Sequence, residues 1–257
     1  MVVVWGDPIV PHAGGGEAGE APYPARMAEH HITGGTGDTP LIDAATVVLL
    51  RDTAAGVECL MVRKTSGQAF GGLWVFPGGR VEDADGTGFE GARRGAVREA
   101  AEETGLVVDA EALVPLSHWT PPTTAPRRYA TWFFVAALPE GAADVEVDGG
   151  EIGDHVWTAP ADAIARHASG EIEIIPPTWV TLQRVADLAA CGTAAGTVDA
   201  AAAEEADRYF TRMARQGDAL VTLWQGDAGY ASGDADAPGA RHRLVMDPAG
   251  WRYERSR

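Results

Sequence analysis

The chain has 257 residues, of which 46% are hydrophobic and 22% charged, a composition typical of a globular protein that buries a core. It carries 37 acidic and 20 basic residues, so its formal net charge is −17. Nucleic acids and anionic membranes attract basic surfaces, so this charge argues against both as partners. Two cysteines cannot form a disulfide framework, and no apolar run reaches the length of a membrane span. We therefore expect a soluble protein of the cytoplasm.

The first elements are readable from glycine content and hydrophobic alternation. Residues 1–40 are rich in Gly, Pro and Ala and are predicted to form a flexible leader. Two β-rich runs follow at 45–50 and 57–62, and the short turn between them predicts a hairpin. Strong helix formers fill 90–104, and Gly105 predicts the end of that helix.

The rest of the chain is predicted to complete one domain and to add an extension. The domain covers 41–178 and the extension 179–257. Further strands are expected at 113–118, 129–138 and 151–157, and a short helix at 161–168. In the extension, helices are predicted at 178–190 and 199–215, and strands that pair with each other at 219–224 and 242–246. This order predicts an α+β fold whose C-terminal extension is mostly helical and packs on the core.

The predicted helix at 90–104 carries three glutamates on one face. Glu99, Glu102 and Glu103 stand at positions i, i+3 and i+4, which share one side of a helix. Like charges repel there unless a cation lies among them, and Mg²⁺ binds carboxylates together with water and phosphate oxygens. Arg98, one turn before Glu102, is expected to form an ion pair with it. A solvated acidic surface is the alternative explanation of the three glutamates alone.

The segment around these glutamates resembles the signature of the Nudix hydrolase superfamily, G-x5-E-x7-R-E-U-x-E-E-x-G-U, where U is apolar. Glu90 and the run from Arg98 to Leu106 match its second part without a gap. Ten residues separate Gly79 from Glu90 where the signature has five, so we predict a loop insertion at 83–88. Such an insertion costs little closure entropy.

The resemblance implies a Nudix fold, with a mixed central β-sheet sandwiched between helices, and hydrolysis of a nucleoside diphosphate linked to another group. It implies Mg²⁺ or Mn²⁺ as cofactor, with Glu99 and Glu103 as the principal metal ligands. Glu102 is expected to bind the metal or its water, and the Gly79 carbonyl to complete the metal shell. Arg98 is expected to orient the glutamates, and Glu90 is a candidate for a supporting role behind them.

A catalytic base and substrate ligands are expected outside the glutamate helix. In many members of the superfamily the base lies in a loop before a strand near the active site, and the resemblance therefore implies Glu151, which follows a glycine-rich loop, as the candidate base. A plain loop carboxylate is the alternative. Paired cations suit the phosphates of a diphosphate substrate. The candidates for this role are Arg63, Lys64, Arg127 and Arg128.

The lead-in to Gly79 and the aromatic run at 129–134 resemble the coenzyme A (CoA) and acyl-CoA diphosphatases of this superfamily. That branch would release 3′,5′-ADP and phosphopantetheine, or its acyl form. Gln68 stands where the CoA pattern has arginine, so two alternatives stay open. One is hydrolysis of ADP-ribose, NADH or a nucleoside triphosphate, and the other is a non-catalytic module that senses a nucleotide or binds a partner. The resemblance also implies a homodimer.

Overall fold

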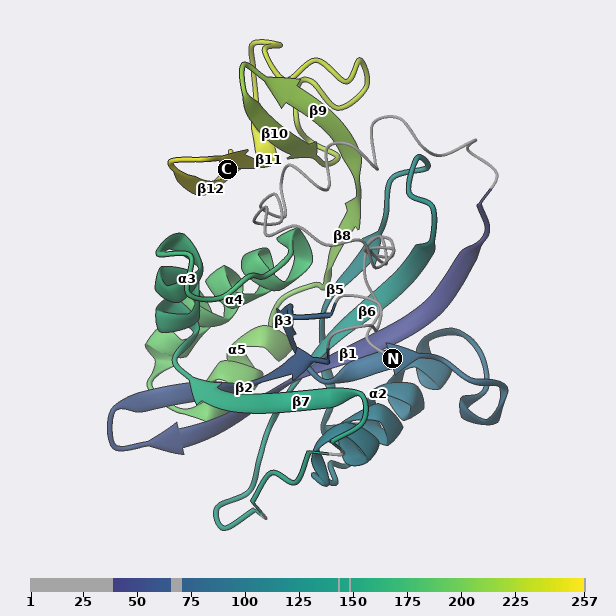
Figure 1. The fold of residues 1–257 in the computed structure, drawn as a ribbon, viewed down its shortest axis with the longest axis vertical. Coiled ribbons are helices and arrows are strands. Elements are labelled where there is room, and N and C mark those ends of the chain that lie inside the picture. The colour runs from purple at the N-terminus through teal and green to yellow at the C-terminus, as the bar shows by residue number, and fades with distance from the viewer. Residues whose placement is uncertain (1–38, 66–70, 143, 148, 257) are drawn as a thin grey trace, which may run out of the picture. The chain divides into compact units, whose positions relative to one another are not determined.

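The computed structural model describes residues 39–65, 71–142, 144–147 and 149–256 (Figure 1). The chain divides into two compact units. The first consists of Ile42–Trp119 and Tyr129–Arg208, and the second includes Thr120–Arg128 and Tyr209–Arg257. Residues 1–38 of the predicted leader lie outside the described residues.

The first unit is built on a β-sheet of eight strands. They are β1 (Leu41–Thr53), β2 (Gly56–Lys64), β3 (Trp74–Val75), β4 (Gly78–Arg80), β5 (Val114–Thr120), β6 (Arg128–Ala137), β7 (Ile152–Thr158) and β8 (Asp207–Phe210). The strand order is β3-β2-β1-β6-β5-β8, with β4 paired to β1 and β7 paired to β2. The hairpin predicted from the first two runs is confirmed, because β1 and β2 are antiparallel and Thr53 pairs with Gly56.

Helices cover the sheet on both faces. They are α2 (Gly88–Thr104), α3 (Pro160–Ala168), α4 (Pro176–Leu188) and α5 (Ala194–Ala202), with single 3₁₀ turns at Asp83–Asp85, Ala110–Ala112 and Ala189–Cys191. Figure 1 shows α2 on one side of the sheet, with α3 and α4 on the other. The buried alanines of α2 pack with Leu49, Leu60 and Phe134 of the sheet in one apolar core. The predicted α+β class is therefore confirmed.

The second unit contains an antiparallel sheet of four strands in the order β12-β11-β10-β9. The strands are β9 (Arg212–Gln216), β10 (Ala219–Leu223), β11 (His242–Asp247) and β12 (Gly250–Arg255). The predicted pairing of 219–224 with 242–246 is confirmed, since Leu220 pairs with Met246.

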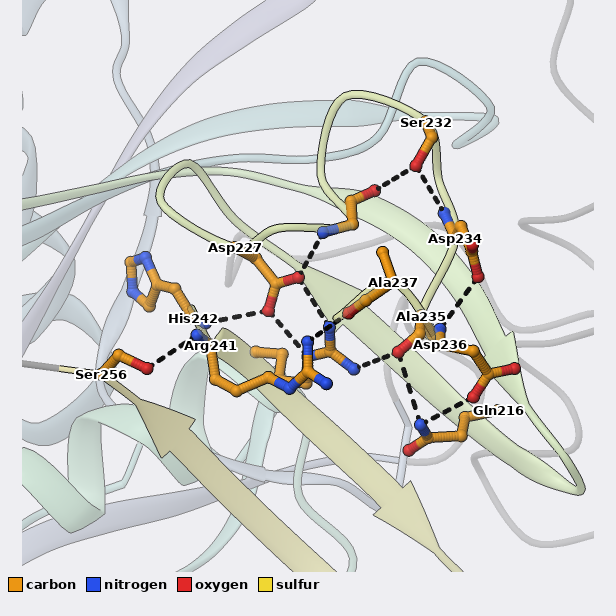
Figure 2. A network of polar contacts seen from close by, with 12 residues as sticks. Gln216, Asp227, Ser232, Asp234, Ala235, Asp236, Ala237, Arg241, His242 and Ser256 are labelled. Carbon is orange, nitrogen blue, oxygen red and sulfur yellow. Dashed lines mark hydrogen bonds and ion pairs between the residues drawn. The ribbon is translucent and has the colours of Figure 1, made fainter. Parts of the chain in front are cut away.

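A buried ion pair stabilises the long loop between β10 and β11, and Figure 2 shows its acidic member, Asp227, beside His242. The carboxylate of Asp227 lies 2.6 Å from the Arg243 guanidinium, and both side chains are at most 1% exposed. Asp227 also accepts hydrogen bonds from the backbone amides of Gly229 and His242. Burial by itself raises the pKa of Asp227, but these hydrogen bonds and the charge of Arg243 outweigh it and hold the pKa below its ordinary value.

The prediction of a helix over 199–215, and with it a mostly helical extension, is wrong. Helix α5 ends at Ala202, and strands β8 and β9 occupy Asp207–Phe210 and Arg212–Gln216. Tyr209 is buried and its neighbour Phe210 is exposed, which is the two-residue period of a strand. Pairing of β9 with β10 supplies the hydrogen bonds that local helix propensity alone does not reveal.

Among the described residues, no helix combines the length and the apolar character that crossing a bilayer requires.

Candidate active site

Helix α2 carries two buried glutamates one turn apart. It ends at Gly105, whose φ of 71° lies in the left-handed region that favours glycine. Glu99 and Glu103 are 5% and 2% exposed, while Glu102 points outward with a largely exposed side chain. Burying two carboxylates is costly unless cations or hydrogen-bond donors face them. The contacts of these two glutamates therefore define the candidate site.

Glu103 is held by a buried cation and a backbone amide. The ammonium nitrogen of Lys64 lies 2.7 Å from Glu103 Oε1, and the Gly78 amide donates to Glu103 Oε2 at 3.0 Å. The same ammonium lies 3.5 Å from Oε1 of Glu151. Strand pairing explains this convergence, because Lys64 at the end of β2 is paired with Ile152 at the start of β7. The structure thus brings the candidate base Glu151 and the candidate metal ligand Glu103 to one cation.

Arg98 contacts two further glutamates of α2, Glu99 and Glu102. Its guanidinium lies 3.1 Å from Glu99 Oε1 and 2.9 Å from Glu102 Oε2. The predicted ion pair between Arg98 and Glu102 is therefore confirmed. Arg98 also donates to the Arg80 carbonyl and, through Nε and Nη2, to both carboxylate oxygens of Asp85. This fork fixes the guanidinium beside the helix.

Asp85 is the site residue that the sequence analysis missed. It is buried, and its carboxylate accepts the Glu82 backbone amide as well as Arg98. Glu90, which was expected to stand behind the glutamates, is 59% exposed and approaches Arg93 at 4.0 Å. The signal for Asp85 was the spacing, because five residues separate it from Gly79, as in the first part of the signature. The extra residues then lie between Asp85 and Arg98.

Two pKa shifts follow from these contacts. Burial raises the pKa of Glu103 above its ordinary value, although the Lys64 charge and the Gly78 amide act in the opposite direction. Burial also tends to raise the pKa of Asp85, but the hydrogen bonds from Arg98 and the Glu82 amide outweigh it and lower the pKa. Asp85 is therefore ionised at neutral pH and serves as a fixed partner for Arg98.

Gly78 and Gly79 lie in β4, directly against β1. Gly79 is paired with Ala45, and a side chain on Gly78 would collide with the Ala45 carbonyl oxygen and with Thr46. Glycine at position 78 therefore lets the strand come close enough to donate its amide to Glu103. The Gly79 carbonyl, predicted as a metal ligand, belongs to the strand that makes this contact.

The donor set of this site fits a magnesium-type cation. Within the described residues, no three His, Cys, Asp or Glu side chains converge closely enough to hold a metal by themselves. Mg²⁺ is commonly bound by one or two carboxylates together with water and substrate phosphates, so a closed protein cage is not required. The two buried carboxylates Glu99 and Glu103 supply the hard oxygen ligands that such an ion prefers.

The predicted substrate ligands differ in their exposure and in the compact unit to which they belong. Arg63 is exposed on β2, one residue from the buried Lys64. Arg127 and Arg128 belong to the second unit, where Arg128 donates to the Thr39 and Pro121 carbonyls. Gln68 lies outside the described residues.

Comparison with known proteins gives one family match and one similar curated protein. Residues 40–177, more than half of the chain, match the family model of the NUDIX domain. The chain is 27% identical over 203 residues to the acyl-coenzyme A diphosphatase NUDT19 of Gallus gallus. The alignment covers 70% of this chain and 53% of that protein, so the chain spans about half the length of this relative.

A solved structure supports the fold. The NUDIX hydrolase from Alicyclobacillus acidocaldarius is 23% identical in sequence and superposes with a TM-score of 0.55. The superposition covers 63% of this chain and 97% of that one.

Proposed function

Because the chain belongs to the NUDIX hydrolase family, we propose that it hydrolyses the diphosphate linkage of CoA or acyl-CoA. The products would be 3′,5′-ADP and phosphopantetheine or its acyl form, and the cofactor Mg²⁺ or Mn²⁺. The name of the Gallus gallus relative, an acyl-coenzyme A diphosphatase, supports this substrate class.

The observation that carries the proposal is the network of carboxylates and cations around α2. Lys64 and Arg98 between them contact five carboxylates. These are Asp85, Glu99, Glu102, Glu103 and Glu151. Among the described residues this network thus joins five carboxylates to two cations, and two of its glutamates are almost fully buried. A divalent cation would bind such carboxylates and provide the attraction that an anionic diphosphate needs.

Each residue of the site has a proposed task. Glu99, Glu103 and the Gly79 carbonyl would hold the metal, and Glu102 would contact its water. The bound metal would screen the phosphate charge and acidify the attacking water. Arg98 keeps Glu99 and Glu102 in place.

Glu151 is proposed as the general base. It accepts a proton from the water while the water oxygen forms a bond to phosphorus and the bridging P–O bond breaks. The leaving phosphate departs as an anion. The ammonium of Lys64, 3.5 Å away, holds Glu151 Oε1 beside Glu103, and so places the proposed base next to a proposed metal ligand.

CoA carries a 3′-phosphate in addition to its diphosphate, and we propose that Arg63, Arg127 and Arg128 bind its phosphates. Lys64 was grouped with them from the sequence, but its ammonium is buried between carboxylates. We also propose that the protein is a homodimer. Its mass in solution by light scattering tests this, and a monomer mass would refute it.

The experiment is a substrate panel with product identification. The full chain is incubated with CoA, acetyl-CoA, ADP-ribose, NADH or a nucleoside triphosphate, with Mg²⁺ or with a chelator. We expect 3′,5′-ADP from both CoA substrates, and only with the metal. Consumption of ADP-ribose without release of 3′,5′-ADP from CoA would favour the other hydrolase activity. Tight nucleotide binding without turnover of any substrate would favour a non-catalytic module.

A paired variant separates loss of chemistry from loss of folding. Glu103→Gln removes a charge at the site and should lower kcat by about 100-fold or more. Glu111→Gln removes the same charge from a side chain that is 80% exposed, and it should retain the parent rate. Equal rates for Glu103→Gln and the parent would contradict the proposed role of Glu103.

A further inference from the structure

Lys64 is an unusual residue in this chain. It is the only lysine among 20 basic residues, the others being arginine. Its side chain is 1% exposed, whereas lysine is normally among the most exposed residue types. The protein therefore places its one lysine in the least favourable environment for an ammonium group, and a local interaction must compensate that cost.

The compensating interactions come from the two carboxylates on either side of the ammonium. Glu103 Oε1 lies at 2.7 Å and Glu151 Oε1 at 3.5 Å. A buried charge of this kind is tolerated only when its partners are close and well oriented. An ammonium is a compact point charge with three donors, whereas a guanidinium is a planar fork of five. Lysine is therefore the better fit between two converging carboxylates in a closed space.

We propose that Lys64 is the internal counter-ion of the metal site. In the metal-free protein its ammonium pairs with both Glu103 and Glu151 and offsets one negative charge, and a divalent cation that binds Glu103 competes with this ion pair. The inference rests on the proposed function in one respect, namely that Glu103 ligates the metal. It follows that Lys64 holds Glu103 and Glu151 together when no metal is bound and lowers the affinity of Glu103 for the cation.

The first test compares Mn²⁺ binding by the parent and two variants of the full chain, measured calorimetrically without substrate at pH 8. Lys64→Met removes the charge and keeps a similar length. Its Kd for Mn²⁺ should fall by about tenfold or more, because a unit positive charge no longer opposes the cation at short range. Arg51→Gln removes an equal charge from a partly exposed side chain paired with Glu58, and its Kd should stay within about twofold of the parent. Unchanged or weaker binding by folded Lys64→Met overturns the proposal.

The second test needs no substitution and therefore does not depend on the variant's folding. Because the chain has one lysine, labelling with [ε-¹³C]lysine gives a single side-chain resonance in NMR spectra. Titration with Mg²⁺ should shift this resonance with the same midpoint as metal binding measured by calorimetry. A resonance that stays in place while Mg²⁺ binds overturns the proposal.

Different results would contradict the proposed function and the counter-ion role of Lys64. If the parent neither binds Mn²⁺ nor hydrolyses any substrate of the panel, the proposed function is wrong, and this proposal with it. If the parent does both but Lys64→Met binds Mn²⁺ no more tightly, only the counter-ion role is wrong.

Discussion

Replacement of Asp85 by asparagine tests the contact that orients the glutamate helix. Asp85 receives three hydrogen bonds from the Arg98 guanidinium, at 3.1 Å, 3.3 Å and 2.9 Å, and one from the Glu82 amide. Asparagine keeps one oxygen acceptor but loses the charge, and it replaces the other acceptor with an amide NH₂, a donor that cannot accept a hydrogen bond from Arg98. A hydrogen bond to a charged group contributes about 1.5–3 kcal/mol. Because Arg98 is partly exposed and retains other partners, we expect Asp85→Asn to lower the free energy of unfolding by about 2 kcal/mol.

The assay is urea unfolding followed by far-UV circular dichroism, with Glu90→Gln as the matched control. Glu90 is the acid that sequence spacing had placed behind the site, but its carboxylate is largely exposed. Its substitution should therefore change the free energy of unfolding by less than about 0.5 kcal/mol. A loss for Glu90→Gln equal to that for Asp85→Asn, or no loss for Asp85→Asn, would refute the assignment of Asp85 as the partner of Arg98.

The pH dependence of the unfolding free energy of the parent and of Asp85→Asn gives an independent check. The pKa of Asp85 is lowered in the folded protein, so the ionised carboxylate stabilises the fold at every pH above its ordinary pKa. That contribution is lost as the pH falls through the lowered folded pKa. The difference in unfolding free energy between parent and Asp85→Asn should therefore be constant from about pH 5 to 8 and shrink below about pH 4. A difference that grows on acidification would contradict the lowered pKa.

Two further predictions concern the second unit and the proposed base. Asp227→Asn should lower the free energy of unfolding by about 3–5 kcal/mol, because it leaves the buried Arg243 guanidinium without its counter-charge. Urea unfolding measures this, with the exposed Asp236→Asn as control, and equal losses for the two variants would contradict it. Glu151→Gln should lower kcat by about 10²–10⁴-fold with little change in KM, because it removes proton transfer but not binding. Steady-state kinetics on CoA checks this, and a parent-like kcat would refute the role of base.

Local signals in the sequence were sufficient for the elements nearest the site. Helix α2 was predicted because strong helix formers end at Gly105, and the structure extends it by only two residues at its start. The hairpin of β1 and β2 was predicted because apolar runs flank a glycine-containing turn. The prediction for 199–215 is wrong because the run of four alanines at 200–203 favours a helix locally, whereas the pairing of β9 with β10 is a contact between strands that propensity does not encode.

The site itself was only partly predictable. The ion pair of Arg98 with Glu102 follows from helical spacing, since the two residues are four apart. The position of Lys64 beside Glu103 does not, because it depends on how the end of β2 lies relative to α2, and 39 residues separate the two side chains in the chain. The sequence therefore predicts the ion pair of Arg98 with Glu102, whereas it groups Lys64 with the substrate ligands and the contacts of Lys64 are with carboxylates.

The added residues ahead of Arg98 show which distances the site must preserve. Asp85 keeps the five-residue separation from Gly79, and the strand that holds Gly79 also supplies the Gly78 amide to Glu103. Extra residues before Asp85 would have moved the carboxylate relative to β4 and left Arg98 without its partner. Only Gly86 and Thr87 lie between Asp85 and α2, so the extra residues after Asp85 belong to the first turns of the helix, and the spacing from Arg98 to Gly105 stays the same. The ion pair of Asp85 with Arg98 thus accounts for where this chain accommodates an insertion without disturbing the glutamate helix.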